Sequence, residues 1–148
     1  MILKGEKGFT LLEIMVVVII IGLLATMVAI NVVAKKCDAE RRIAMVDIRA
    51  LEDSLELYKL DNHSYPDMEQ GIKALIETPS TGQIPCCWNG PYLKKRDVPK
   101  DPWSRPYLYR YPGSQSDYDI ITLGEDGVTG GAKCDADITN FTIEEESR

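Results

Sequence analysis

The chain has 148 residues, a length that suits one compact domain with one additional element rather than two domains. Its formal net charge of −6, with no basic stripe to offset it, argues against nucleic acid as the main partner. The apolar residues are concentrated between Leu11 and Ala34, and the remainder is polar and acidic but long enough for one modest core.

The segment from Leu11 to Ala34 predicts a membrane-spanning helix. Glu13 is its only charged residue, and at about 1.5 Å per residue the segment is long enough to cross a bilayer core of about 30 Å. It is apolar on every side, which is typical of a membrane span or of a helix buried among other helices. A secretory signal is the alternative, although such signals have a shorter apolar region followed by a small-residue cleavage site.

Glu13 is expected to have a partner, because a carboxylate inside an apolar helix costs on the order of a few kcal/mol even on lenient insertion scales. Cleavage between Gly8 and Phe9 would place the new α-ammonium group of Phe9 one helical turn from Glu13. The ammonium group of a neighbouring subunit would pair with Glu13 equally well and would set the axial register between packed helices. The alternative is a carboxylate that simply reaches the membrane interface.

The run GFTLLE from Gly8 to Glu13, followed by a long apolar segment, resembles the leader and first helix of type IV pilins and pseudopilins. In that family a prepilin peptidase cleaves after the glycine and methylates the phenylalanine. The resemblance therefore implies a leader at residues 1–8, N-methylation of Phe9 and a register role for Glu13. Ile30 stands where many relatives have a proline that would open the helix, so the resemblance does not carry that opening over to this chain, although Gly22 and Asn31 still weaken the helix locally.

Beyond Lys36 the apolar residues recur with a 3.6-residue period, which predicts that the same helix continues and packs on a small domain. The stripe expected to face the core is Ile43, Val46, Ala50, Leu51, Leu55 and Tyr58. Turn formers from Asp61 and then Pro66 end this helix. His63, the only histidine, is expected in a solvated loop, and no Ser/His/Asp or Cys/His set is evident in the sequence.

A second helix is predicted to begin near Asp67, which can cap it, with Gln70 at the capping-box position. Short runs then predict strands at 107–111, at 118–123 and at 138–143, and in the first of them Tyr107, Tyr109 and Tyr111 alternate with Leu108 and Arg110. The order of two helices followed by a small antiparallel sheet predicts an α+β fold.

In this part of the chain the resemblance becomes specific to one group of pseudopilins. The segments YKLDN (58–62), YP (65–66), EQG (69–71), DPW (101–103) and PY (106–107) resemble the major pseudopilins of type II secretion. This implies a type IV pilin-like fold, no enzymatic activity, a single span at 9–34 in the bacterial inner membrane, and a periplasmic globular domain at 35–148.

The same resemblance implies a function. Copies of the chain would polymerise into a periplasmic filament, the pseudopilus, that drives folded proteins across the outer membrane. The implied partners are minor pseudopilins, an inner-membrane assembly platform, the prepilin peptidase and a secretin channel. A type IV pilus subunit for adhesion or twitching is the nearest alternative, and a membrane-anchored periplasmic enzyme or binding domain is a more remote one.

A glycine-rich acidic loop runs from Leu123 to Asp137. Its carboxylates and carbonyls are the hard oxygen ligands that calcium prefers, although such loops are commonly just solvated. The resemblance to major pseudopilins implies one structural calcium ion, held by the side chains of Asp126, Asp135 and Asp137 and by the carbonyls of Leu123 and Val128.

Four cysteines lie in the part of the chain predicted to be periplasmic, where an oxidising environment would permit one or two disulfides. The residues alone leave the pairing open, and their spacing disfavours a zinc–thiolate site. They are Cys37, Cys86, Cys87 and Cys134.

Overall fold

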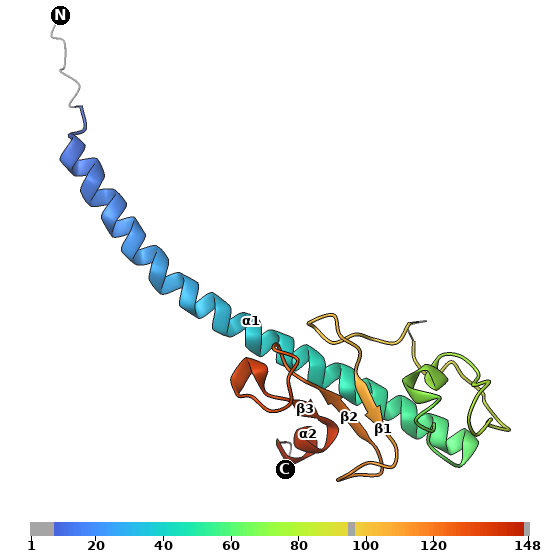
Figure 1. The fold of residues 1–148 in the computed structure, drawn as a ribbon. Coiled ribbons are helices and arrows are strands. Elements are labelled where there is room, and N and C mark those ends of the chain that lie inside the picture. The colour runs from blue at the N-terminus through green and yellow to red at the C-terminus, as the bar shows by residue number, and fades with distance from the viewer. Residues whose placement is uncertain (1–7, 95–96, 147–148) are drawn as a thin grey trace, which may run out of the picture. The chain divides into compact units, whose positions relative to one another are not determined.

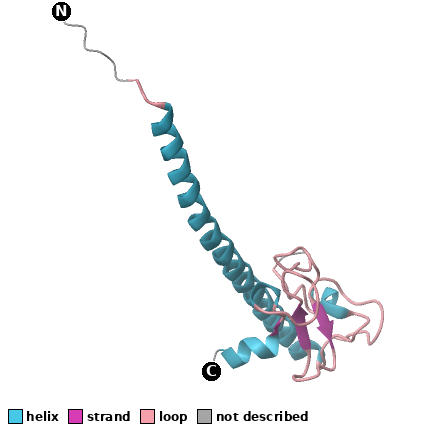
Figure 2. Cartoon of the chain, turned by 60° about the vertical axis from the view of Figure 1, so that its left-hand side comes forward, coloured by secondary structure: helices cyan, strands magenta, loops and turns pink. Residues whose placement is uncertain are grey.

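The computed structural model describes residues 8–94 and 97–146, and the side chains of residues 26–34 and 144–146 lie outside what it describes. The chain divides into two units, Met1–Lys36 and Cys37–Arg148, each of which is considered by itself. Figure 1 gives the order of the elements, and Figure 2 distinguishes helix, strand and loop.

The predicted long helix is confirmed as α1, Leu11–Asn62, which is 52 residues long. Thr10 caps its first turn, because the backbone N–H of Glu13 lies 3.2 Å from the Thr10 hydroxyl oxygen. The helix ends at Asn62, and the next residue, His63, adopts a left-handed backbone with φ of 61°. His63 is exposed, as predicted.

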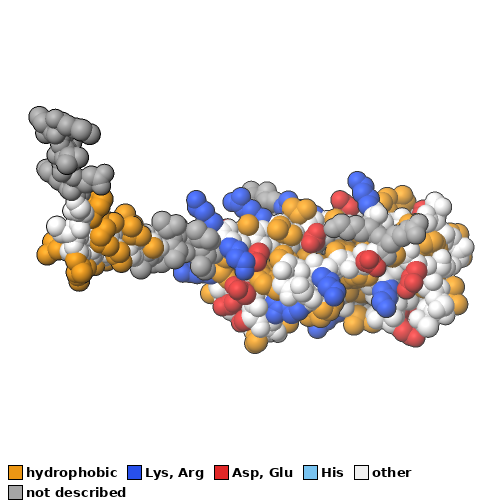
Figure 3. Space-filling view, turned by 90° about the horizontal axis from the view of Figure 1, so that it is seen from above, with side chains coloured by type: hydrophobic (Ala, Val, Ile, Leu, Met, Phe, Trp, Pro, Cys, Tyr) orange, Lys and Arg blue, Asp and Glu red, His pale blue; other side chains and the backbone are white. Residues whose placement is uncertain are grey.

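In the first unit, the described side chains of α1 are exposed and almost all apolar (Figure 3). Within the described residues, no helix combines the length and the apolarity needed to cross a membrane. The predicted span includes residues 26–34, whose side chains lie outside the described residues.

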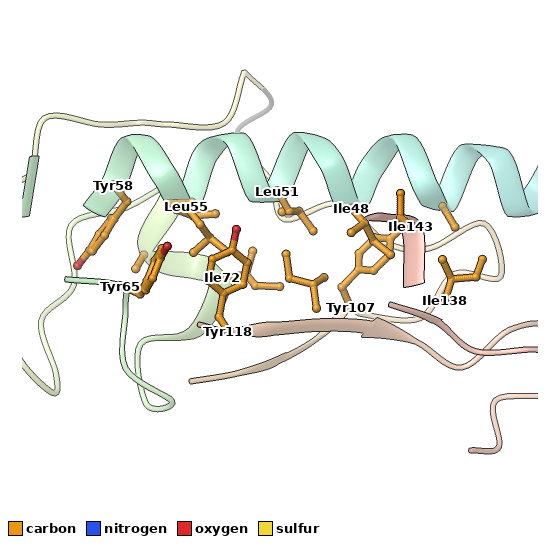
Figure 4. Packing of buried hydrophobic residues seen from close by; sticks show 14 residues of the cluster. Ile48, Leu51, Leu55, Tyr58, Tyr65, Ile72, Tyr107, Tyr118, Ile138 and Ile143 are labelled. Atoms are coloured by element: carbon orange, nitrogen blue, oxygen red, sulfur yellow. The ribbon is translucent and has the colours of Figure 1, made fainter. Parts of the chain in front are cut away.

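In the second unit, α1 forms one wall of the core through a stripe of residues spaced four and three apart, here called the inner stripe. It consists of Ala44, Ile48, Leu51, Leu55 and Tyr58, each at most 1% exposed. This spacing returns to one helical face every turn. Figure 4 shows the stripe packed against Tyr107, Tyr118 and Ile138. Full burial of each large aliphatic side chain contributes about 1.5–3 kcal/mol.

The predicted core stripe was wrong at three positions. Ile43, Val46 and Ala50 are exposed, the first two by 53% and 64%. At 100° per residue they lie on the face opposite the inner stripe, and Leu57 and Leu60 lie there too. The helix therefore carries a second apolar stripe, which the sequence pattern merged with the first. This outer stripe consists of Ile43, Val46, Ala50, Leu57 and Leu60.

The second helix is shorter than predicted and has 3-10 geometry, spanning Gly71–Leu75 (η1). Its predicted caps are present in the turn before it. One Asp67 carboxylate oxygen accepts the backbone N–H groups of Glu69 and Gln70, each at 2.9 Å. The side-chain oxygen of Gln70 accepts the N–H of Asp67 in return, at 3.3 Å. The left-handed backbone of Gly71, with φ of 57°, separates this capped turn from η1.

The sheet has the strand order β1-β2-β3 and is antiparallel throughout. Its strands are β1 (Leu108–Arg110), β2 (Asp119–Thr122) and β3 (Ile138–Thr139). In the register Tyr109 pairs with Ile120, and Ile121 pairs with Thr139. The first two predicted strands are confirmed with slightly shorter bounds, as is the α+β class.

The strand predicted at 138–143 was wrong beyond Thr139, because the chain turns there into α2, Asn140–Glu146. The side-chain oxygen of Asn140 accepts the N–H of Ile120 at 3.0 Å, and its amide donates to the Tyr118 carbonyl at 3.1 Å. These bonds take the place of the next backbone hydrogen bonds between the two strands. The hydroxyl of Thr139 then accepts the N–H of Thr142 at 3.2 Å and caps the new helix.

Candidate functional site

The predicted processing site lies directly before α1. Gly8, Phe9 and Thr10 are non-helical and exposed, and the Phe9 side chain is 78% exposed. The peptide bond between Gly8 and Phe9 is thus exposed in a segment outside the helix, where a peptidase can reach it. Residues 1–7 of the predicted leader lie outside the described residues.

Glu13 lies in the first turn of α1 and is exposed. A carboxylate at a helix N-terminus is stabilised by the unpaired N–H groups there, by about 0.3–1 kcal/mol. That amount is smaller than the cost of placing a carboxylate in an apolar environment. The position therefore still calls for a cationic partner in an apolar assembly, and the register role of Glu13 stays a prediction.

The glycine-rich loop is folded tightly on itself. A Cβ atom at Gly131 would lie 2.4 Å from the Asp135 carbonyl oxygen, and one at Gly124 would lie 2.6 Å from the Asp135 carbonyl carbon. Both glycines also have a left-handed backbone, with φ of 83° and 65°. The N–H of Glu125 donates to the Cys134 carbonyl at 2.9 Å, which joins the two arms of the loop.

The predicted calcium ligands are not gathered into one cluster. In the part of the chain that the structure describes, no three acidic, histidine or cysteine side chains form a group that could hold a metal ion. Asp126 accepts the N–H of Val128, and Asp137 accepts the N–H of Gly130, each at 3.0 Å. The other carboxylate oxygen of Asp137 is buried and has no hydrogen-bond partner among the described residues. A buried, unpaired carboxylate oxygen fits a hard cation such as calcium.

Two arginines hold this loop in place, and sequence reasoning missed both. Arg41 on α1 donates to the carbonyls of Lys133 and Ala136, each at 2.9 Å. Arg105 donates to the Gly124 carbonyl and lies 3.6 Å from the Asp101 carboxylate. The i,i+4 pair with Asp101 was a weak signal for Arg105, whereas no local pattern connects Arg41 to a loop more than 90 residues away.

Asp101 of the DPW segment organises the chain between that segment and the sheet. It is buried, and one of its carboxylate oxygens accepts the N–H groups of Trp103 and Arg105, at 3.1 and 2.7 Å. The other oxygen accepts the hydroxyl of Thr122 on β2, at 2.7 Å. The DPW segment is thus a structural turn, and a buried carboxylate with three donors satisfies its hydrogen-bonding capacity without a ligand.

The YKLDN and YP segments fix the end of α1. Lys59 donates to the Tyr65 hydroxyl at 3.1 Å, and that hydroxyl donates to Glu56 at 2.6 Å. Burial, followed by the hydrogen bond to Glu56, raises the pKa of Tyr65 to about 12. The Tyr92 hydroxyl donates to Asp61 at 2.9 Å and holds the following loop against the same helix end.

Cys37 and Cys134 form a disulfide with a Cα–Cα distance of 5.5 Å and a sequence separation of 97. It joins α1 to the arm of the loop that contains Asp135 and Asp137. The sequence left the pairing of the four cysteines open, and the structure contains a disulfide between these two. Cys86 and Cys87 are exposed and free.

Comparison with known proteins gives a consistent result. The family described as type II secretion system (T2SS), protein G, matches residues 31–141, and the prokaryotic N-terminal methylation motif matches residues 3–29. Similar proteins include the type II secretion system core protein G of Pseudomonas aeruginosa, 45% identical over 139 residues that cover 93% of this chain and 96% of the relative. That of Vibrio cholerae is 43% identical over 143 residues and 97% of each chain.

Among solved structures, the chain is similar to the major pseudopilin from the type 2 secretion system of enterohaemorrhagic Escherichia coli. The TM-score is 0.64 at 38% sequence identity, over 74% of this chain and 88% of the other. The predicted type IV pilin-like fold and the resemblance to major pseudopilins are confirmed by these similarities.

Proposed function

The chain belongs to the type II secretion system protein G family, and from this premise we propose that it is a structural subunit of the pseudopilus. Copies would polymerise into a filament that drives folded proteins across the outer membrane. Minor pseudopilins, an inner-membrane assembly platform, a prepilin peptidase and a secretin channel are the proposed partners. The observation that carries the proposal is the exposed GFTLLE motif at the start of an apolar helix that continues into the globular core.

We further propose that the segment from Phe9 to Ala34, most of which belongs to α1, anchors the chain in the inner membrane, with the globular unit in the periplasm. Cleavage after Gly8 would release residues 1–8 and leave a methylated Phe9. Mass spectrometry of the protein from its source membranes tests this directly. A mature chain lacking those residues and carrying one methyl group is expected, whereas an intact leader would contradict the proposal.

The role of Glu13 is tested in a bacterium whose own copy of the gene is deleted. The deletion is expected to retain folded exoproteins in the periplasm, and the wild-type chain to restore their release. Glu13→Leu should be inserted and cleaved but should not polymerise, because the carboxylate that pairs with a neighbouring ammonium group is gone. Glu13→Asp, which keeps the charge, is the matched control. Normal filaments from Glu13→Leu would refute the register argument.

The outer stripe of α1 gives the globular unit its own surface for assembly. Leu57 and Leu60 are 52% and 73% exposed, so the stripe leaves large aliphatic side chains in water. Two residues of the stripe, Ala50 and Leu57, also line a groove of about 370 Å³ together with Tyr92 and Leu93. We propose that a second copy of the chain covers this stripe, because it lies on the helix whose N-terminal part carries the assembly motif.

Ile43→Asp tests that surface. The side chain is already 53% exposed, so the monomer should keep its stability, while filament formation is expected to fall at least tenfold because a carboxylate would be buried at the contact. Ile84→Asp is the matched control, since Ile84 is 65% exposed and belongs to the loop after η1 rather than to α1. Equal filament yields from the two variants would rule out the outer stripe as the contact.

We also propose that the glycine-rich loop binds one calcium ion through Asp126, Asp135 and Asp137 and through the carbonyls of Leu123 and Val128. The unpaired, buried oxygen of Asp137 supports this, because a cation would satisfy it. When bound, the ion would supply the positive charge that draws carboxylates together. The residues themselves provide hard oxygens on a loop already closed by its glycines.

The melting temperature with calcium and with a chelator tests the calcium proposal. Calcium at about 100 times its Kd would stabilise the folded chain by about 2.7 kcal/mol. Asp137→Asn should remove the response to calcium, while Asp117→Asn, an exposed carboxylate outside the loop, should retain it. Identical melting temperatures with calcium and with chelator would refute the site.

A further inference from the structure

Two adjacent cysteines lie on the surface of the loop between η1 and β1. Cys86 and Cys87 are both exposed and free, and their sulfur atoms are 2.9 Å apart. That distance exceeds the length of a disulfide bond, about 2.05 Å, so the two cysteines are not joined by a disulfide in the structure, and either thiol can donate to the other sulfur. Neither thiol takes part in the core or in the proposed calcium loop.

The chain directly after this pair is anchored to the globular unit. The indole N–H of Trp88 donates to the Ala74 carbonyl at 2.8 Å, and the N–H of Asn89 donates to the Tyr92 hydroxyl at 2.9 Å. Tyr92 in turn is bonded to the end of α1 through Asp61. These contacts hold the two cysteines at the surface, where a dissolved reagent can reach either sulfur.

We propose that Cys86 and Cys87 are a reversible redox pair, converted to a vicinal disulfide by exchange with a low-molecular-weight or protein disulfide. One cysteine, as its thiolate, attacks a sulfur of the incoming disulfide, forms a mixed disulfide and releases one thiolate. The second cysteine loses its proton and attacks the first cysteine's sulfur, which releases the other thiolate. Two cysteine thiols and one external disulfide thus give one intrachain disulfide and two external thiols.

Chain geometry makes this disulfide labile. Adjacent Cα atoms are about 3.8 Å apart across a trans peptide, which is shorter than the 4.4–6.8 Å found for ordinary disulfides. A bond closed over such a short span is strained and easily reduced. The Cα–Cα distance of 5.5 Å between Cys37 and Cys134 lies within the ordinary range. The chain therefore combines a structural disulfide with a reducible one, and exposed, strained disulfides are the ones that exchange.

The hydrogen bond between the thiols of Cys86 and Cys87 also affects the rate of disulfide exchange. The hydrogen bond with Cys86 and the electrostatic interaction with that same neighbour raise the pKa of the Cys87 thiol, with smaller contributions from desolvation and from Asp61. The thiolate fraction at neutral pH is therefore small, and exchange is expected to become faster as the pH rises.

Redox titration of the full-length chain in detergent tests the proposal. The protein is equilibrated with mixtures of reduced and oxidised glutathione, quenched with acid, alkylated and digested for mass spectrometry. At oxidising ratios the peptide with Cys86 and Cys87 is expected to be unalkylated and lighter by two hydrogen atoms, and at reducing ratios doubly alkylated. Its midpoint should require at least tenfold less reduced glutathione than that of Cys37–Cys134.

Cys87→Ser provides the matched variant, because it removes the resolving thiol while leaving an exposed side chain of similar size. A glutathione adduct should then accumulate on Cys86, whereas the wild-type chain should carry none at equilibrium. Persistent adducts on the wild-type chain, disulfide-linked dimers through these cysteines, alkylation at every ratio, or a midpoint equal to that of Cys37–Cys134 would each overturn the proposal.

Discussion

The disulfide between Cys37 and Cys134 is predicted to be a large single contribution to the stability of the globular unit. In the chain-entropy model, a cross-link that closes a loop of 97 residues lowers the entropy of the unfolded chain by an amount worth about 4.7 kcal/mol at 25 °C. We expect the double variant Cys37→Ala, Cys134→Ala to lose about 3–5 kcal/mol of unfolding free energy. The lower bound allows for relaxation around Cys37, which is buried.

Urea denaturation followed by the fluorescence of Trp88 and Trp103 measures this loss, since both residues report on the globular unit. The dependence of the free energy on urea should also become steeper, because an uncrosslinked chain exposes more surface when it unfolds. The double variant Cys86→Ser, Cys87→Ser is the control and should unfold like the wild type. A loss below about 1 kcal/mol in the Cys37 and Cys134 variant would refute the loop-entropy reasoning.

Three further predictions concern packing, hydrogen bonding and pH. Leu55→Ala, at a site with no exposure, should cost about 2–5 kcal/mol in urea denaturation, and a value near zero would mean that α1 does not pack on the sheet as described. Asn140→Ala should cost about 1–3 kcal/mol, because the Ile120 N–H and the Tyr118 carbonyl lose their partner, and faster amide exchange at Ile120 should accompany it. Hydrogen bonds from the N–H groups of Gln83 and Gln70 lower the pKa of Asp67, so its contribution is present above the pKa of the unfolded chain and is lost as the pH falls through the lower folded value. Melting temperatures measured from pH 6 to pH 2 should fall less steeply for Asp67→Asn than for the wild type.

The elements predicted from the sequence were those with a strong local signal. The course of α1 to Asn62 followed from its unbroken pattern and from the turn formers after it, and the caps at Asp67 and Gln70 followed from their spacing. The start of α2 was missed because the short run from Ile138 to Ile143 is rich in β-branched and aromatic residues, which favour a strand. Only the tertiary bonds of Asn140 to the neighbouring strand show that the sheet ends there.

The candidate sites, too, could be predicted only where their residues give a local signal in the sequence. The motif at Gly8 and Phe9 could be predicted because its residues are contiguous. The two stripes of α1 could not be separated, since periodicity shows which residues share a face but not which face another part of the chain covers. The anchoring of the glycine-rich loop by Arg41 and by the disulfide depends on contacts across more than 90 residues, for which the sequence contains no local signal.

The side chain of Asn140 has a consequence for how copies of this protein can join. It occupies the backbone groups of Ile120 and Tyr118 that would otherwise bond the next residue of a strand, and the chain then leaves the sheet as a helix. An unpaired strand edge is a template on which other chains aggregate. Because this stretch of β2 is closed by its own chain, another chain cannot pair with Tyr118 and Ile120 there without first displacing Asn140.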